Sequence, residues 1–203
     1  MKIATWNINS IRIRVNQVID ILLKENIDIL CLQETKVSND LFPRKLFNDK
    51  GYEFICVNGQ KQYNGVAIIS RVPLDNTYSK DFSAKEEKRH ISITLKNGIE
   101  IHNFYFPAGG IEPDVKTNIK FAEKLEFYNK VTCWVKSKKN KKKLILVGDM
   151  NVAPTPQDVW SHEKLINIVS HTPIEIKYYN ALYKSLNWVD AVRYIMGEKK
   201  KIF

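Results

Sequence analysis

Polar residues that can bind a metal ion or move a proton stand directly after several apolar runs of this chain. Glu34 and Asp149 each come two residues after a continuous apolar run, and Asn7 follows a short alternating run. Ligand sites in α/β proteins collect at strand ends, because the rigid backbone there aims side chains into a common crevice. Taken singly, each of these residues is explained equally well as an ordinary polar residue that caps a loop.

The residue types favour a hard metal ion. Carboxylate and carboxamide oxygens suit Mg²⁺ or Mn²⁺, and Mg²⁺ commonly uses one or two carboxylates together with waters and phosphate oxygens. Glu34 and Asp149 fit that pattern. Zinc would call for histidines or thiolates at ligand spacing, but Cys31, Cys56 and Cys133 are far apart and stand in apolar runs. We expect these cysteines to pack as small hydrophobic residues, without disulfides.

Apolar periodicity predicts the elements that position these residues. Period-2 or continuous runs predict strands at 3–6, 27–32, 52–57, 66–70 and 144–147, and helical spacing predicts helices at 11–23, 119–135 and, from weaker patterns, 164–170 and 177–187. Ser10 is a plausible N-cap of the first helix. Two alternating runs between 90 and 106 flank Asn97-Gly98, which favours a hairpin with a type I′ turn. His102, on the second of these runs, is expected at the surface.

The bulk composition suits one α/β domain of mixed sheets covered by helices, over residues 1–203. The net charge of +10 suits a polyanionic partner, although a lysine-rich composition also follows from an AT-rich genome. Residues 1–9 lack an apolar segment typical of a signal peptide, and no run reaches the ~18 apolar residues of a membrane span. The sequence therefore predicts a cytoplasmic protein that does not enter a membrane.

Several short motifs follow one another in a specific order. They are Trp-Asn-Ile-Asn at 6–9, Leu-Gln-Glu-Thr-Lys at 32–36, Asn-Gly-Val-Ala-Ile at 64–68, Tyr-Phe-Pro at 105–107, Gly-Asp-Met-Asn-Val-Ala-Pro at 148–154 and Trp-Val-Asp-Ala-Val-Arg at 188–193. Together they resemble the exonuclease III family of the endonuclease/exonuclease/phosphatase superfamily, collinearly from Lys2 to about Tyr194. The resemblance implies an α/β fold with a two-sheet β-sandwich core flanked by helices.

The resemblance also implies roles for individual residues. Glu34 and Asn7 would hold the catalytic metal, Mg²⁺ (or Mn²⁺), with Asp149 and Asn151 in the same group of metal-binding residues. Tyr105 would contact the scissile phosphate, and Asp149 would act as the acid or base. Asn151 would donate a hydrogen bond to the phosphoryl oxygen in the transition state. Outside this context, Tyr105 would be interpreted as an aromatic residue packed on a core.

Contacts to DNA are expected from a second set of residues. The resemblance puts Arg89 near the substrate-facing side, so Arg89 is the expected DNA-binding residue. The lysine-rich run at 136–143 is either a DNA contact or a solvated loop, and the second is more usual. Asp190 matches a position near the family's site, but it is equally explained as a helix cap.

One part of the family pattern is missing. The family ends with a tryptophan-rich stretch and a final strand that carries an aspartate followed by a histidine, and none of His90, His102, His162 and His171 follows an aspartate. We therefore expect a domain that is C-terminally incomplete and lacks its last strands.

The expected function is metal-dependent hydrolysis of DNA phosphodiesters in base-excision repair. The substrates would be double-stranded DNA with abasic sites or 3′ ends, cut by an abasic-site endonuclease and a 3′→5′ exodeoxyribonuclease, and no protein partner is expected. Because the Asp-His segment is absent, the activity is expected to be reduced or lost. The alternative is an inactive remnant that retains DNA binding. A third possibility, hydrolysis of small phosphoesters, is disfavoured by the motifs and the basic charge.

Overall fold

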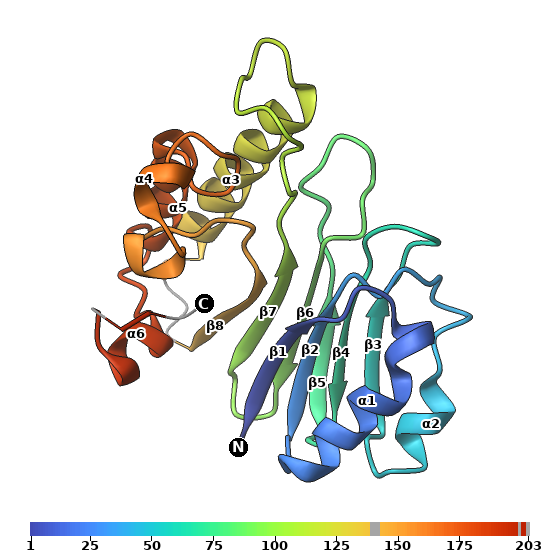
Figure 1. Ribbon diagram of the computed structural model, residues 1–203. Coiled ribbons are helices and arrows are strands. Elements are labelled where there is room, and N and C mark those ends of the chain that lie inside the picture. The colour runs from blue at the N-terminus through green and yellow to red at the C-terminus, as the bar shows by residue number, and fades with distance from the viewer. Residues whose placement is uncertain (139–142, 199, 202–203) are drawn as a thin grey trace. The chain divides into compact units, whose positions relative to one another are not determined.

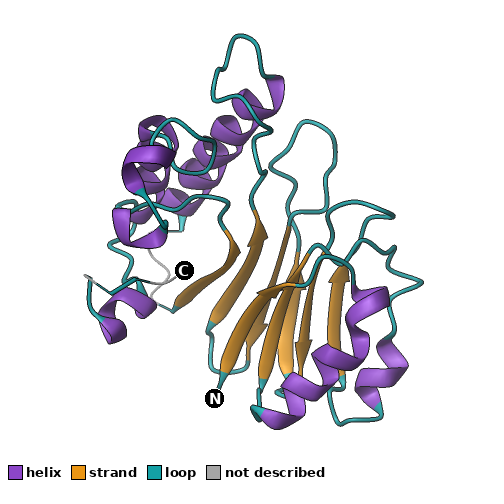
Figure 2. Cartoon of the chain, in the orientation of Figure 1, coloured by secondary structure: helices purple, strands orange, loops and turns teal. Residues whose placement is uncertain are grey.

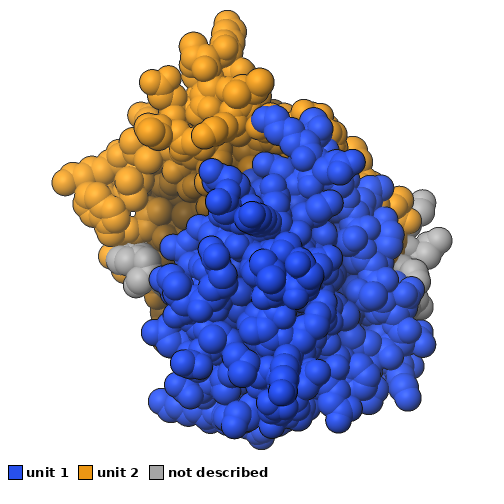
Figure 3. Space-filling view, turned by 90° about the vertical axis from the view of Figure 1, so that its right-hand side faces the viewer, with its two compact units in different colours: residues 1–105, 142–150 blue, residues 106–141, 151–203 orange. Residues whose placement is uncertain are grey.

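The chain forms two compact units (Figure 3): residues 1–105 with 142–150, and residues 106–141 with 151–203. The computed structural model describes residues 1–138, 143–198 and 200–201. Positions 139–142 of the lysine-rich run lie outside the described residues, so a DNA contact by that run stays a prediction. The single domain expected over residues 1–203 also stays a prediction.

The first unit contains two four-stranded sheets (Figure 2). One has the order β1-β2-β4-β3 and consists of β1 (Ile3–Asn7), β2 (Ile29–Gln33), β4 (Val66–Ser70) and β3 (Phe54–Asn58). The other has the order β5-β6-β7-β8 and consists of β5 (Leu74–Tyr78), β6 (His90–Leu95), β7 (Glu100–Tyr105) and β8 (Leu144–Asp149). β1 pairs parallel with β2, and β7 pairs parallel with β8. All other pairs are antiparallel, so the expected α/β fold with two mixed sheets is confirmed.

Strand β2 is buried along its whole length because both of its faces are covered. Ile29 and Cys31 pack in a cluster that includes Ile93 and Ile101 of the other sheet. Leu30 and its neighbours on the opposite face pack against α1 (Ile11–Lys24) and α2 (Arg44–Asn48), which cover the outer face of the β1-β2-β4-β3 sheet (Figure 1). This double coverage explains why residues 29–32 are continuously apolar rather than alternating.

Two buried amides connect the sheets at the ends of β2 and β7. Gln33 Nε2 donates to Asn103 Oδ1 over 2.6 Å, and Asn103 Nδ2 donates to the carbonyl oxygens of Leu32 and Ala67 over 2.9 and 3.0 Å. A buried polar group left without its partner costs about 1–3 kcal/mol, so this network favours one alignment of the two sheets. It lies one residue before Glu34 and two residues before Tyr105 in the sequence.

The expected hairpin joins β6 and β7, but its turn type was predicted wrongly. Leu95 N–H donates to Ile99 C=O over 2.9 Å, and Gly98 N–H donates to Leu95 C=O over 2.8 Å. Gly98 has a φ of 78°, whereas Asn97 is not among the residues with positive φ. A type I′ turn needs positive φ at both central residues, so the loop is the three-residue kind with glycine in the left-handed position.

The second unit is built from helices. These are α3 (Ile119–Ser137), the short 3₁₀ helix η1 (Pro156–Asp158), α4 (His162–Leu165), α5 (Pro173–Tyr183) and α6 (Ala191–Met196). Asn118 caps α3 by accepting hydrogen bonds from the N–H groups of Lys120 and Phe121. Asp190 caps α6 by accepting from the N–H of Arg193 over 3.0 Å, as one of its two interpretations predicted. None of the described helices is long and apolar enough to span a membrane.

The boundaries of α4 and α5 differ from the prediction. The segment 164–170 is helical only at its beginning, because α4 ends at Leu165. Helix α5 begins at Pro173, before the predicted start at 177, because Thr172 and Glu175 form a reciprocal capping box with proline in the first turn. The Thr-Pro-x-Glu sequence was the signal for this start.

Two predictions of exposure were wrong. His102 is buried rather than at the surface, and its Nδ1 lies 3.2 Å from Nε2 of His90. The face of the sheet on which it lies is covered by aromatic packing, including Phe82 against His90 with ring centroids 5.5 Å apart. Cys133 is exposed on α3 rather than packed in the core, because it falls off the buried stripe of that helix. All three cysteines are free, as expected.

Candidate active site

The ends of β1 and β2 are joined beyond the paired strands by backbone hydrogen bonds. The N–H of Ile8 donates to Gln33 C=O over 3.1 Å, and the N–H of Ser10 donates to Glu34 C=O over 2.7 Å. Ser10 occupies the N-cap position of α1, as predicted, although its side chain makes no capping hydrogen bond. The beginning of α1 is held instead by the backbone of the loop after β2, which fixes Glu34 relative to Asn7.

The side-chain amide of Asn7 bridges two carboxylates. Its Nδ2 lies 2.8 Å from Oε1 of Glu34 and 2.8 Å from Oδ2 of Asp149. Asn7 is the last residue of β1, Glu34 follows β2 directly, and Asp149 is the last residue of β8. Three strand ends from two sheets therefore meet at one amide nitrogen, within the first unit.

Glu34 is held as a carboxylate. Burial opposes its charge, but hydrogen bonds from Asn7, Lys36 and Tyr105 outweigh the burial and lower the pKa of Glu34. Lys36 Nζ lies 2.8 Å from Glu34 Oε2 and also donates to Oδ1 of Asn9. The sequence assigned no role to Lys36, although its place two residues after Glu34 in a polar cluster was a usable signal. The backbone of Glu34 has a φ of 54°, an uncommon conformation for a non-glycine residue.

Tyr105 lies at the end of β7, opposite Asp149 in the parallel register. Its hydroxyl hydrogen-bonds to Glu34. Burial, with the nearby negative charge of Glu34, raises the pKa of Tyr105 above its ordinary value. The phenol therefore keeps its proton and serves as a hydrogen-bond donor at neutral pH.

Arg89 packs on Tyr105 rather than extending freely into solvent. Its guanidinium carbon lies 4.7 Å from the Tyr105 ring centroid, and its Nε donates to Glu87 Oε2 over 2.6 Å. Only 11% of the Arg89 side chain is exposed. These contacts orient Tyr105 from one face. The expected contact of Arg89 with DNA stays a prediction.

Asn151 belongs to the second unit and is not among the residues that the first unit brings together. Its Nδ2 donates to Phe106 C=O over 2.8 Å, and its own carbonyl accepts from Lys124 Nζ over 2.6 Å. Since Asn151 follows Asp149 by two residues, the chain itself keeps their Cα atoms within about 7 Å.

The donor set in the first unit fits a hard divalent cation. Two carboxylates converge on one amide nitrogen in a partly buried place, with Glu34 ionised, and two like charges so close repel each other. A cation bound by Glu34 and Asp149 would relieve that repulsion. Asn7 would join them as an oxygen ligand by turning its amide, because its oxygen now accepts from the N–H of Asn9 over 3.1 Å while its nitrogen faces the carboxylates. In the described part of the chain, no three His, Cys, Asp or Glu side chains lie close enough together to hold a metal ion. The expected metal-binding set, with two carboxylates and two amides, does not require such a group.

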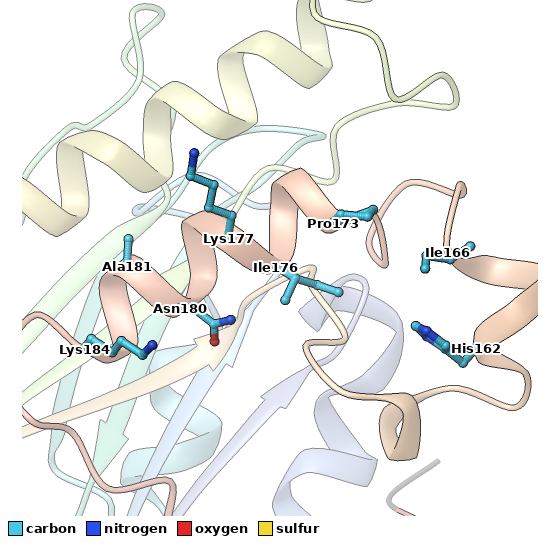
Figure 4. A pocket seen from close by; sticks show the side chains of 8 residues that line it. All are labelled: His162, Ile166, Pro173, Ile176, Lys177, Asn180, Ala181 and Lys184. Carbon is cyan, nitrogen blue, oxygen red and sulfur yellow. The ribbon is translucent and has the colours of Figure 1, made fainter.

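A separate groove lies in the second unit (Figure 4). It is lined by His162, Ile166, Pro173, Ile176, Lys177, Asn180, Ala181 and Lys184. None of the residues expected in the active site lines it. The groove therefore has no part in the candidate active site.

Comparisons with known proteins identify the family of the chain. Residues 4–188 match the model of the Endonuclease/Exonuclease/phosphatase family. The chain is 31% identical to exodeoxyribonuclease III of Haemophilus influenzae over 166 residues, covering 78% of this chain and 60% of that protein. The chain thus spans about 60% of the length of this curated relative.

Two solved structures are similar over most of the chain. An AP endonuclease from Archaeoglobus fulgidus is 35% identical with a TM-score of 0.88, covering 98% of this chain and 76% of that one. A 3′ phosphatase, NExo, from Neisseria, bound to a product DNA hairpin, is 30% identical with a TM-score of 0.83, covering 91% of this chain and 71% of that one. With the order of motifs and the strand-end residues described above, these matches show that the chain belongs to the endonuclease/exonuclease/phosphatase family as an exonuclease III-type member.

Proposed function

We propose that this chain hydrolyses phosphodiester bonds of double-stranded DNA in base-excision repair, acting at abasic sites and at 3′ ends with Mg²⁺ (or Mn²⁺). The observation that carries the proposal is the bridge from Asn7 to Glu34 and Asp149, with Tyr105 hydrogen-bonded to Glu34. The similarity to an exodeoxyribonuclease III, an AP endonuclease and a 3′ phosphatase bound to DNA supports DNA as the substrate. The net charge of +10 is suited to a phosphate backbone.

Glu34, Asp149 and the amides of Asn7 and Asn151 are the proposed metal-binding residues. When bound there, a divalent cation supplies Lewis-acid polarisation of a phosphoryl oxygen. The low pKa of Glu34 matters for this role, because a carboxylate that is already ionised needs no proton release before it binds a cation.

The other residues act on the phosphate and the proton. Tyr105 keeps its hydroxyl proton and would donate it in a hydrogen bond to a phosphate oxygen in place of Glu34. Asp149 would accept or return a proton as the acid or base. Asn151 would donate a side-chain N–H to the phosphoryl oxygen as negative charge builds there. Arg89, already oriented over Tyr105, would add a positive charge near the DNA backbone.

The test measures cleavage of a fluorescent duplex carrying one abasic site and a recessed 3′ end. We expect cleavage that stops in excess EDTA and returns with Mg²⁺. Glu34→Gln and Asp149→Asn should each lower kcat by about 10²–10⁴-fold, since each preserves shape and removes a charge used in binding the metal or moving the proton. The matched controls are Glu126→Gln and Asp20→Asn, which change exposed carboxylates on α3 and α1.

The outcomes separate the competing functions. Undiminished cleavage in EDTA, or parental rates for both site variants, would contradict the proposed site. Binding of the duplex without any cleavage by the parent chain would favour the alternative of an inactive DNA-binding protein. Cleavage of inositol phosphates in place of DNA would favour a phosphatase acting on small phosphoesters.

A further inference from the structure

A fully buried lysine lies on the inner face of α3. Lys124 and its partner Glu175 of α5 are both 0% exposed, and they form an ion pair. Lys124 stands between Phe121, Leu125 and Tyr128 on the buried face of the helix, where an apolar residue would pack at lower cost. Removing an ammonium group from water is expensive, so a lysine at this position calls for a specific reason.

Lys124 joins the two chain segments that follow β7 and β8. Its Nζ donates to Ala108 C=O over 3.1 Å and to Asn151 C=O over 2.6 Å. Ala108 lies three residues after Tyr105, and Asn151 lies two residues after Asp149. A second cross-link runs in parallel, since Asn151 Nδ2 donates to Phe106 C=O over 2.8 Å. The backbone and the side chain of Asn151 are therefore both held within the second unit.

Glu175 anchors the lysine from the other side. Its carboxylate accepts from the N–H of Ser170 over 3.0 and 2.9 Å and from the hydroxyl of Thr172 over 2.6 Å. It also accepts from the backbone N–H of Thr172 over 3.2 Å, which completes the capping box of α5. The surrounding chain is shaped to admit Lys124 as well. A Cβ at Gly109, where φ is +92°, would lie only 2.8 Å from Cδ of Lys124.

We propose that Lys124 is a positioning residue, which holds Asn151 through its backbone carbonyl in the orientation used for DNA hydrolysis, with Glu175 keeping the ammonium in place. This inference rests on the proposed function. It predicts that loss of the ammonium lowers kcat rather than weakening DNA binding, because Lys124 touches Asn151 and not the substrate. A displacement of about 1 Å in a reacting group can cost about 10²-fold in rate.

The experiment compares Lys124→Met and the double variant Lys124→Met/Glu175→Gln in the full chain. The single variant leaves a buried carboxylate without its counter-ion and is expected to lose stability, whereas the double variant removes both charges and is expected to fold. In both, we expect kcat on the abasic duplex to fall by about 10–100-fold with KM unchanged within about twofold. Lys124→Arg, which keeps the charge and the donors, should recover part of the rate.

Two control variants separate positioning from stability. Lys130→Met removes a lysine of the same helix whose partner, Glu126, is on the surface, and it should leave kcat unchanged. Val131→Ala opens a cavity in the same helix without touching the cross-links, so it should lower the unfolding midpoint while kcat of the folded protein stays at the parental value.

A measurement without substrate distinguishes failure of this inference from failure of the proposed function. The N–H of Ala153 donates to Ser170 C=O over 2.7 Å, so its hydrogen-exchange rate reports on the order of the segment that carries Asn151. We expect exchange at Ala153 to speed up at least tenfold in the double variant and to stay unchanged in Lys130→Met. Parental exchange at Ala153 in the double variant, or a kcat loss in Val131→Ala equal to that in Lys124→Met, would overturn the inference. If the parent chain cleaves no DNA, the proposed function fails, and the exchange rate still decides whether Lys124 orders this segment.

Discussion

Asn7 has the central position at the scale of single residues, because one amide nitrogen contacts both Glu34 and Asp149. An amide carries no charge, so it can lie between two carboxylates without the desolvation cost of a buried cation. Its oxygen and the carboxylates are also acceptable magnesium ligands. The same three side chains can therefore be stable without a metal, and they would bind one after Asn7 turns its amide oxygen from the N–H of Asn9 toward the carboxylates.

Lys36 is expected to influence the pH at which cleavage is lost on acidification. The folded protein lowers the pKa of Glu34, so this carboxylate stabilises the fold above its unfolded-state pKa, and that contribution is lost as the pH falls through the folded-state pKa. Lys36→Met removes one of the groups that lower this pKa. We expect the titration of Glu34, followed by carboxyl ¹³C NMR, to move to higher pH, and the acid loss of cleavage to move with it. Lys130→Met is the control, and an unchanged Glu34 titration in Lys36→Met would show that the ion pair does not hold the carboxylate charged.

Single residues also mark where sequence reasoning reached its limit. Glu34, Asp149 and Asn7 were identifiable because each follows an apolar run, and the resemblance added Tyr105. Lys124 was not identified, although it sits on the apolar stripe of a predicted helix, because a lysine in such a pattern usually reaches solvent with its charged end. Whether its ammonium is buried depends on carbonyl groups 16 and 27 positions away and on a carboxylate 51 positions away, which no local pattern encodes.

At the scale of elements, parallel pairing explains why the strand ends converge. β1 with β2 and β7 with β8 run in the same direction, so their carboxyl ends lie side by side, and registers that pair Asn7 with Gln33 and Tyr105 with Asp149 bring the side chains together. The apolar runs predicted these strands and the hairpin. Strand β5 was missed because it is mostly exposed, and α2 and α6 were missed because helices of five and six residues show too little periodicity.

Gly148 allows β8 to approach β7 just before Asp149. A Cβ at this position would lie 1.9 Å from the carbonyl oxygen of Phe104, and φ is +140°. We expect Gly148→Ala to lower the free energy of unfolding by roughly 2–4 kcal/mol, from backbone strain and steric overlap together, and to lower cleavage by displacing Asp149. Urea unfolding measures the first effect and the duplex assay the second.

Gly51→Ala is the matched control for Gly148→Ala. Gly51 also has a positive φ, +84°, but nothing lies within 4 Å of its added Cβ. The Gly51→Ala variant should therefore lose only about 1 kcal/mol of unfolding free energy and keep the parental activity. Equal stability losses for the two variants would mean that the close approach of β8 to β7 does not matter.

At the scale of the whole molecule, the two compact units contribute different parts to the proposed reaction. The first unit holds Asn7, Glu34, Tyr105 and Asp149 together, and the second unit carries Asn151 and the buried lysine that holds it. The chain passes from the first unit to the second directly after Tyr105 and again directly after Met150. Both passages thus lie directly beside residues of the proposed site in the sequence.

The central claim, that Glu34 and its neighbours bind a divalent cation, is tested most directly by paramagnetic NMR. Mn²⁺ broadens signals strongly with proximity, so substoichiometric Mn²⁺ added to ¹⁵N-labelled chain should selectively broaden the side-chain amide of Asn7 and the backbone amides of Glu34 and Asp149. Excess Mg²⁺ should restore these signals, and Glu34→Gln should abolish the effect while Glu126→Gln preserves it. Broadening confined to signals from other surfaces would contradict the account. So would broadening of the Asn7 signal that is the same in Glu34→Gln as in the parent chain.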